Sequence, residues 1–358
     1  MTDPVRAESD TVWNGQGTTP AEIEAALEGM LIQRCGEADS YVPARALNVV
    51  YIVEKHWKGE IANRVREVGG FHASRNIACA VEPRRTSIDA IATMSSNVHP
   101  RAGEFALLRE TVIIDVGEQH LPYLDTIVGP LLVRDVPTIL WSPHGHREAV
   151  DVLLPLADVV LLDSIDEPDV REALQQTGGL LQNTDVVDLA WLRSTPWRER
   201  VAATFDWPQL RPELHMISAI SVRYHPMSGA AGLLLVGWLA SRLDWRLSPL
   251  LPRLGAFFGS ARAHRTEVRI ALEPVSRQFV RGLAGLTLET ASGRCFSLDR
   301  GPGGLQARYR NARGDDRQWT VLGASRGEPG ILGEGIQHAL ERDPTYGPAL
   351  AAALELVR

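Results

Sequence analysis

The chain has 358 residues, of which 44% are hydrophobic and 23% are charged, close to the average of globular proteins. This length exceeds one core of ordinary size and predicts two domains. The formal net charge of -7 disfavours nucleic acids and anionic membranes as partners, because their binding relies on basic surfaces. Met1 to Pro20 lack a secretory signal, and no apolar run suits a membrane helix. We therefore expect a cytoplasmic protein.

The first domain is expected at residues 20–186, after a flexible tail at residues 1–19. Its first helix starts at Thr19-Pro20, with Glu22 placed as in a capping box. Strands are then predicted at 46–53, 76–82, 106–116, 137–141 and 159–163, and helices at 60–68, 120–132, 150–156 and 170–178. Apolar strands that alternate with helices are typical of an open, at least partly parallel α/β sheet.

The second domain is expected at residues 187–358, beginning with a connecting helix rich in Trp and Arg. A strand at 215–224 and a helix at 229–243 are followed by strand-like runs at 267–272, 285–290, 295–298, 306–309 and 318–321. Turn residues separate these runs, which is typical of antiparallel hairpins. Helices are expected at 330–342 and from 348 onward. The pattern predicts an α+β domain with a largely antiparallel sheet.

Motifs for nucleotide binding are absent: neither G-x-G-x-x-G nor a P-loop follows a predicted strand. The nearest approach is YHPMSGAAG, residues 224–232, where the helix that starts after Ser228 is able to hold an anion. Simple capping and close packing are the alternative. Arg75, in the polar segment before the second strand, is a candidate for anion or partner contact, with structural hydrogen bonding as its alternative.

The sequence gives little support for a metal site or for a reactive thiol. His144 and His146 form an H-x-H pair without evident further ligands, so no metal site and no cofactor are predicted. The three cysteines are expected to be free thiols, since they form no C-x-x-C pair. Cys79 lies in a predicted buried strand, which leaves Cys295 as the better candidate for a redox thiol.

Two further observations concern catalysis and charge. No group of residues offers a nucleophile, a base and an oxyanion donor together, so no catalytic residue is predicted. Between Arg253 and Arg281 the chain has six arginines and His264. This run suits a phosphorylated metabolite or an acidic partner surface, and a solvated strand face is the alternative.

The segment DLAWLRSTPWRER, Asp188 to Arg200, lies where the first pattern gives way to the second. Pro196 is expected to break its helix. Tryptophan and arginine dominate the energetics of protein interfaces. The candidate partner-binding residues are Asp188, Trp191, Arg193, Trp197 and Arg198. The alternative is an interdomain helix whose tryptophans belong to the core.

Several pieces of the chain resemble the OpcA family of glucose-6-phosphate dehydrogenase assembly proteins from actinobacteria and cyanobacteria. They are ARALNVV (44–50), SRNI (74–77), DLAWLRSTPWRE (188–199) and GWLASRLDW (237–245). Where the family has H-P-S-R, this chain has Ala73 in place of the proline. Cyanobacterial relatives look like redox-responsive regulators, which is why Cys295 is considered.

The resemblance implies a non-catalytic, allosteric partner that binds glucose-6-phosphate dehydrogenase and promotes its oligomerisation or activity. The process would be the oxidative pentose phosphate pathway, which supplies NADPH. A different class of function stays open: a sugar-phosphate-binding or sugar-phosphate-transforming α/β enzyme, suggested by the sheet and by the helix start near Ser228. The sequence does not predict the oligomeric state of the chain itself.

Overall fold

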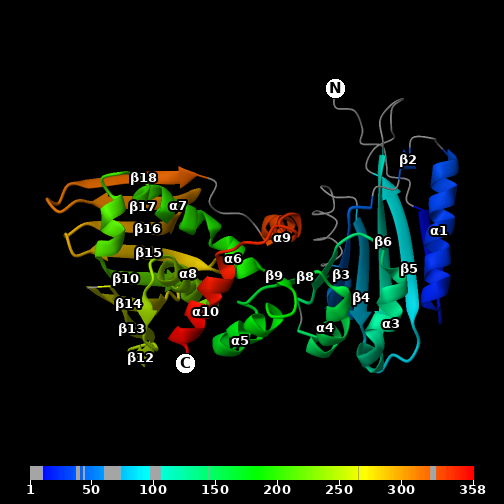
Figure 1. The fold of residues 1–358 in the computed structure, drawn as a ribbon. Helices are drawn as coiled ribbons and strands as arrows, with labels where there is room; N and C mark the ends of the chain where they lie inside the picture. Colours follow the sequence, from blue (N-terminus) through cyan, green and yellow to red (C-terminus); the bar gives the residue numbers. More distant parts are fainter. Residues whose placement is uncertain are drawn as a thin grey trace. The chain divides into compact units, whose positions relative to one another are not determined.

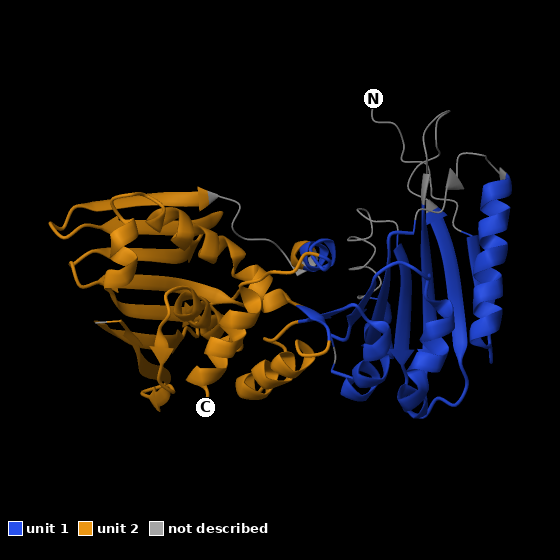
Figure 2. Ribbon diagram, viewed as in Figure 1, with its two compact units in different colours: residues 1–162, 184–186, 332–340 blue, residues 163–183, 187–331, 341–358 orange. Residues whose placement is uncertain are grey.

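The computed structural model describes residues 11–37, 41–42, 45–59, 74–96, 106–143, 145–264, 266–322 and 328–358. The chain forms two compact units (Figure 2): unit 1 contains residues 1–162, 184–186 and 332–340, and unit 2 contains residues 163–183, 187–331 and 341–358. The domains expected from sequence divide the chain at residue 186, whereas in the structure residues 163–183 group with unit 2. The helix expected at 60–68 and the residue His144 lie outside the described residues.

Unit 1 is built on a mixed, mostly parallel sheet (Figure 1), which confirms the predicted fold class. Its strand order among the described residues is β1-β5-β6-β4-β3-β7-β8-β9, with β2 beside β6. The strands are β1 Thr11–Gly15, β2 Tyr41–Val42, β3 Leu47–Glu54, β4 Ser74–Val81, β5 Asp89–Ser96, β6 Ala106–Val116, β7 Thr138–Trp141, β8 Val159–Leu162 and β9 Asp185–Asp188. Parallel pairing runs from β6 through β4, β3 and β7 to β8.

Two antiparallel strands extend this sheet beyond the sequence prediction. β1 lies in the segment that was expected to be a tail, and it pairs with β5. β5 pairs in turn with β6. Val12 and Asn14 of β1 point outward and are more exposed than their neighbours, so the strand has one solvated side and no continuous apolar run. That alternation, over so few residues, is a weak strand signal.

The first helix of unit 1, α1 (Pro20–Glu37), begins as predicted. The backbone N–H of Thr19 donates to Glu22 Oε2 over 2.9 Å, and the Glu22 N–H donates to Thr19 Oγ1. In place of one helix at 120–132, the chain forms η2 (Glu118–Tyr123), α3 (Leu124–Val128) and η3 (Gly129–Leu131). Pro122 and Pro130 remove backbone donors there, which explains the interruption. The remaining short elements are η1 (Lys55–Trp57), α4 (Arg147–Leu153) and η4 (Leu154–Leu156).

Unit 2 contains a mostly antiparallel sheet, as predicted. Its order among the described residues is β11-β13-β14-β10-β15-β16-β17-β18, with β12 beside β13. The strands are β10 Ile217–Tyr224, β11 Arg246–Leu247, β12 Leu251–Arg253, β13 Ala256–Ala263, β14 Thr266–Pro274, β15 Leu283–Thr290, β16 Cys295–Gly301, β17 Gly304–Arg310 and β18 Asp316–Leu322. β15 to β18 form the expected meander, and β10 and β14 are the parallel pair.

The helices of unit 2 are α5 (Val170–Leu180), α6 (Leu189–Arg193), α7 (Thr195–Phe205), η5 (Arg211–Met216), α8 (Gly229–Arg242) and α10 (Tyr346–Leu356). α9 (Glu328–Gln337) precedes α10. α8 is buried along most of its length and packs against β10 and α10. A Cβ atom on Gly237 would lie 2.2 Å from the carbonyl oxygen of Ala349, so glycine is what allows α8 and α10 to approach so closely. Among the described residues, no helix has the length and hydropathy that a membrane span requires.

Candidate functional site

The Trp/Arg segment forms two short helices inside unit 2. α6 ends at Arg193, Ser194 separates it from α7, and Pro196 lies in the first turn of α7, where its missing donor is harmless. The side chains of Trp191 and Trp197 are buried, at 2% and 1% exposure. This burial agrees with core packing, the alternative that the sequence left open for the two tryptophans.

Arg198 and Trp191 form a stacked pair that is closed by an acidic residue. The Arg198 guanidinium lies 3.5 Å from the centroid of the Trp191 ring. The indole N–H of Trp191 donates to Asp343 Oδ2 over 2.7 Å, and Arg198 Nη1 lies 3.6 Å from the same oxygen. Burial lowers the pKa of Arg198 to about 10, opposed by the charge of Asp343, so the guanidinium stays protonated at neutral pH. The arrangement fixes α6 and α7 to the loop before α10.

Asp188 organises the other side of the segment. Its side chain is buried, caps α6 by accepting from the Ala190 N–H over 2.9 Å, and accepts from the Ser164 N–H over 3.1 Å. The Tyr346 hydroxyl donates to its second oxygen over 2.9 Å. Burial raises the pKa of Asp188, while these donors oppose the rise. The carboxylate therefore holds three parts of unit 2 together.

Arg193 completes the network through an ion pair with Asp163, at 2.6 Å. Burial raises the pKa of Asp163, and the neighbouring Arg193 counteracts it. All five candidate residues of the segment thus make contacts within unit 2. Sequence reasoning missed Asp163, Asp343 and Tyr346, because they lie far along the chain and carry no local motif.

The two candidate anion contacts are occupied by the protein itself. Arg75 is 1% exposed, and it pairs with Glu110 at 2.6 Å and with Glu24 at 2.7 Å. Ser228 is fully buried, and its hydroxyl accepts from the Gly282 N–H over 2.9 Å. Both side chains are buried and make polar contacts within their own units, unit 1 for Arg75 and unit 2 for Ser228.

The thiols differ in their surroundings. Cys79 lies in the buried strand β4, where burial raises its pKa to about 12. Cys295 is half-buried at the start of β16, and burial raises its pKa as well, opposed by Arg310. A raised pKa reduces the thiolate fraction and so the reactivity. Neither environment is that of an activated cysteine.

The carboxyl edge of the unit 1 sheet is where doubly wound folds bind ligands, at the point where strand order reverses. Here that point lies between β3 and β7. It is bridged by His146, whose Nε2 lies 3.2 Å from Glu54 Oε1. Beside it, Lys55 pairs with Glu82 at 2.5 Å and Lys58 pairs with Asp115 at 2.9 Å.

The described residues of this edge differ from those of a dinucleotide-binding turn. Residues 54–59, after β3, read EKHWKG and hold no glycine-rich turn. Burial lowers the pKa of His146, against the charges of Glu54 and Glu118, so the imidazole is neutral near pH 7. A pyrophosphate placed here would face carboxylates that are already paired with the available lysines. In the described part of the edge, Lys55 and Lys58 form ion pairs with carboxylates of the protein, and His146 lies beside Glu54.

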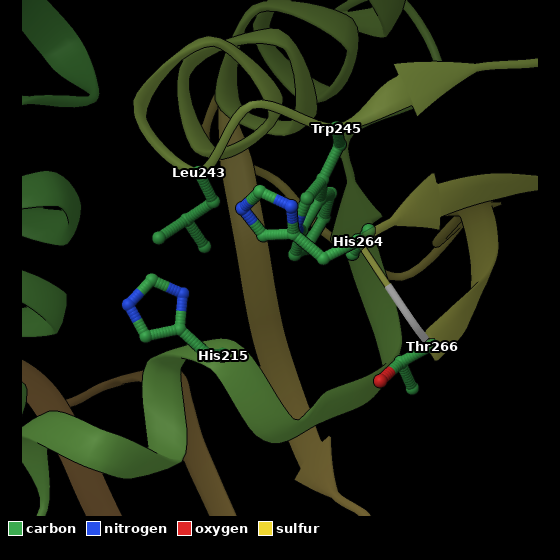
Figure 3. Close-up of a pocket in the computed structure, with 6 residues that line it drawn as sticks. His215, Leu243, Trp245, His264 and Thr266 are labelled. Carbon is green, nitrogen blue, oxygen red and sulfur yellow. The ribbon is translucent and has the colours of Figure 1, made fainter.

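Unit 2 has an open pocket at the β11 edge of its sheet (Figure 3). The pocket has a volume of about 460 Å³ and is lined by His215, Leu243, Trp245, Ala263, His264 and Thr266. A neighbouring hollow of about 500 Å³ shares His264 and Thr266 and adds Arg246 and Arg262. These two arginines are register partners on β11 and β13. Like charges directly opposite each other are unfavourable unless an anion or an acidic group lies near, and Glu267, which also lines this hollow, is the register partner of Arg262 on β14.

Comparison with known proteins identifies the family to which the chain is related. A model described as the glucose-6-phosphate dehydrogenase subunit N-terminal domain matches residues 65–178, and one described as the C-terminal domain of the same subunit matches residues 184–350. The two models bear the name OpcA and together cover more than half of the chain. The chain belongs to the OpcA family. The resemblance found in the sequence is confirmed.

Cyanobacterial relatives bear the same family name. The OxPP cycle protein OpcA of Synechocystis sp. (strain PCC 6803) is 32% identical over 33% of this chain and 26% of its own length. The protein of that name from Synechococcus elongatus (strain PCC 7942) is 28% identical over 38% of this chain and 32% of its own length. The aligned part therefore spans about a quarter to a third of these relatives.

Solved structures resemble the chain in fold only. The oxidoreductase yhhX is 12% identical, with a TM-score of 0.46 over 87% of this chain and 95% of that chain. Bacillus subtilis yvaA, named as an oxidoreductase, is 9% identical, with a TM-score of 0.46 over 85% of this chain and 92% of that chain. Similarity at this level carries no inference about activity.

Proposed function

We propose that the chain is a non-catalytic cytoplasmic protein that binds glucose-6-phosphate dehydrogenase and promotes its assembly or activity in the oxidative pentose phosphate pathway. The observation that carries the proposal is the match of both family models, each described as a domain of a glucose-6-phosphate dehydrogenase subunit. The relatives named as OxPP cycle proteins point to the same pathway.

The ion-paired edge of the unit 1 sheet supports a role without chemistry. Glu54, Glu82 and Asp115 lie at the edge of the sheet where doubly wound enzymes bind their ligands. Glu82 and Asp115 are ion-paired with lysines, and Glu54 lies 3.2 Å from His146. In the described part of this edge, Lys55 and Lys58 are held by carboxylates of the protein itself, which compete with a phosphate for them. Such a sheet serves as a scaffold that presents other surfaces to a partner.

The mechanism that we propose is thermodynamic linkage. A partner raises the activity of an enzyme only if it binds the active or assembled form better than the alternative form. A tenfold shift of that equilibrium requires about 1.4 kcal/mol of differential binding free energy. Burial of one or two large side chains at an interface supplies a free energy of this size.

The test is to assay purified glucose-6-phosphate dehydrogenase from the same organism with and without this protein. We expect a complex in native mass measurements, together with a change in kcat or in the KM for glucose 6-phosphate. An unrelated acidic protein at equal concentration controls for crowding. Identical kinetics and identical mass in both samples would remove the proposal.

A sugar-phosphate-binding protein is the second candidate. It is favoured by the pocket of unit 2, where Arg246, Arg262 and His264 lie together, with Glu267 as the acidic residue of the same hollow. Thermal-shift measurements with pentose phosphate pathway intermediates distinguish the two functions. A strong stabilisation of the isolated protein by one metabolite, reversed in Arg262→Ala, would favour this candidate.

A further inference from the structure

The most exposed apolar side chains of unit 2 include a group at the edge of its sheet, on the hairpin formed by β12 and β13 (Figure 1). We call residues 251–258 the hairpin tip. Leu254 is 96% exposed, Leu251 is 69% exposed, and Phe257 and Phe258 are both about 40% exposed. Four large apolar side chains within eight residues form a contiguous exposed patch, whereas a single exposed leucine is common on protein surfaces.

Apolar side chains lie on both faces of the hairpin tip, although Phe257 is partly covered on the face that it shares with the buried Leu272. Leu251 is the register partner of Phe258, and Pro252 is the register partner of Phe257. Directly paired residues share a face of a hairpin, and neighbouring residues alternate between faces. Apolar side chains therefore occupy both faces of the hairpin tip. Ordinary hairpins bury one face and solvate the other.

The turn at the end of the hairpin holds the exposed Leu254 in an unfavourable backbone conformation. Leu254 and Gly255 form a two-residue loop with φ values of 53° and 79°. Such turns favour asparagine, aspartate or glycine at the first position, because a bulky side chain fits the left-handed region poorly. Leu254 is 96% exposed and so packs against little of its own chain, which means that the turn itself offers no reason for a leucine at this position.

The base of the hairpin is fixed to unit 2. The Leu250 N–H donates to the Leu356 carbonyl over 2.8 Å, and the Ser248 N–H donates to the Ser260 carbonyl over 2.9 Å. The strand β13 is also paired with β14 along its length. The tip is thus presented by a rigid base, which lowers the ordering cost of binding.

The charge around the hairpin indicates the chemistry of its partner. Residues 244–267 contain four arginines and two acidic residues, in a chain whose net charge is -7. Glu267 is the register partner of Arg262, whereas Arg253 lies next to the turn with no acidic residue among its neighbours in sequence. Arg246, Arg253 and Arg262 are exposed. A convex apolar tip flanked by arginines complements an apolar recess with an acidic rim.

We propose that the hairpin tip inserts into an apolar, acid-rimmed recess on glucose-6-phosphate dehydrogenase. This assignment rests on the proposed function, and the C-terminal family model, residues 184–350, contains the hairpin. Leu254 is the central contact, and Arg253 is the charged contact beside it. The unfavourable turn conformation is retained because the leucine is buried in the complex.

The test compares the dissociation constants of matched variants with the purified dehydrogenase. Leu254→Asn suits the turn better than leucine and removes the apolar contact. We expect it to weaken binding about tenfold or more, which corresponds to 1.4 kcal/mol. Arg253→Glu should also weaken binding and reduce its dependence on salt concentration. Ile32→Asn is the control: Ile32 is 73% exposed on α1 of unit 1, and its replacement should change binding less than twofold.

The outcomes separate the two proposals. If the wild-type protein binds and Leu254→Asn binds equally well, the hairpin proposal fails while the proposed function stands. If the wild-type protein does not bind the dehydrogenase, the proposed function fails and the hairpin assignment falls with it. Two further results would overturn the assignment. In the first, Leu254→Asn binds the dehydrogenase normally and loses only binding to phosphatidylglycerol vesicles. In the second, it binds the dehydrogenase normally and loses only self-association.

Discussion

Two regions of unit 2 share a composition and differ in their environment. The Trp/Arg segment of α6 and α7 and the hairpin tip of β12 and β13 both combine large apolar side chains with arginines. In the segment, Trp191 and Trp197 are buried, and their arginines pair with residues of the same unit. In the hairpin tip, Leu254 is almost fully exposed.

The difference teaches that residue type alone does not identify an interface. Tryptophan and arginine are common in hot spots because they bury much area and form directed contacts, and they bring the same advantages to a core. An interface residue has to be accessible before binding. By this criterion the hairpin tip is the better candidate, and the following predictions contrast the two regions.

The largest effect is expected at Trp197. Trp197→Ala removes a fully buried indole from α7 and leaves a cavity, so the free energy of unfolding should fall by about 3–5 kcal/mol. Urea denaturation followed by circular dichroism measures this loss. A melting curve close to that of the wild type, together with lost partner binding, would show instead that the indole belongs to an interface.

The next effect concerns Asp188. Asp188→Ala leaves the Ser164 and Ala190 N–H groups without their acceptor, and should cost about 1–3 kcal/mol of stability. Asp188→Asn keeps an acceptor oxygen and removes the charge, so it should retain most of the stability at pH 7. Equal losses in both variants would show that the charge itself is required.

The same pair tests a pH dependence. Because burial raises the pKa of Asp188, the folded state binds this proton more tightly than the unfolded state. Stability from this group is therefore complete below the unfolded pKa of about 4 and declines as the pH rises through the folded pKa. Denaturation between pH 4 and pH 8 should show a shallower decline for Asp188→Asn than for the wild type.

Much of the fold could be predicted from the sequence. β3 and β4 are buried on both faces, so they appear as continuous apolar runs, and the capping box at Thr19 and Glu22 marked the start of α1. β5 was missed because DAIATMSS mixes polar and small residues and lacks such a run. β12 and β13 were not predicted, because their turn is Leu-Gly, without the asparagine or aspartate typical of a two-residue hairpin loop.

The candidate site was harder to predict for a physical reason. The amphipathic pattern of residues 188–200 is the same whether the apolar side meets a partner or the rest of unit 2. What decides is the position of Asp343 and Tyr346, which reach Trp191 and Asp188 only after the chain has folded. Exposure of Leu254 is likewise a property of the tertiary structure.

A smaller effect is expected from the stacked pair of α6 and α7. Arg198→Lys keeps the charge but loses the planar group that lies over Trp191, and should cost about 1 kcal/mol. A double-mutant cycle with Trp191→Phe isolates the coupling between the two side chains. Additive losses would mean that the stacking contributes nothing beyond the separate contacts of each residue.

The smallest effect has the opposite sign and completes the comparison. Leu254→Asn places a residue that tolerates the left-handed region at φ 53°, so the free energy of unfolding should rise by up to about 1 kcal/mol. Differential scanning calorimetry would detect this as a slightly higher Tm. A core residue cannot respond in this way, because truncation of its side chain leaves a cavity. If Leu254→Asn instead lowers the Tm as a core substitution does, the leucine packs within its own chain and the contrast between the two regions disappears.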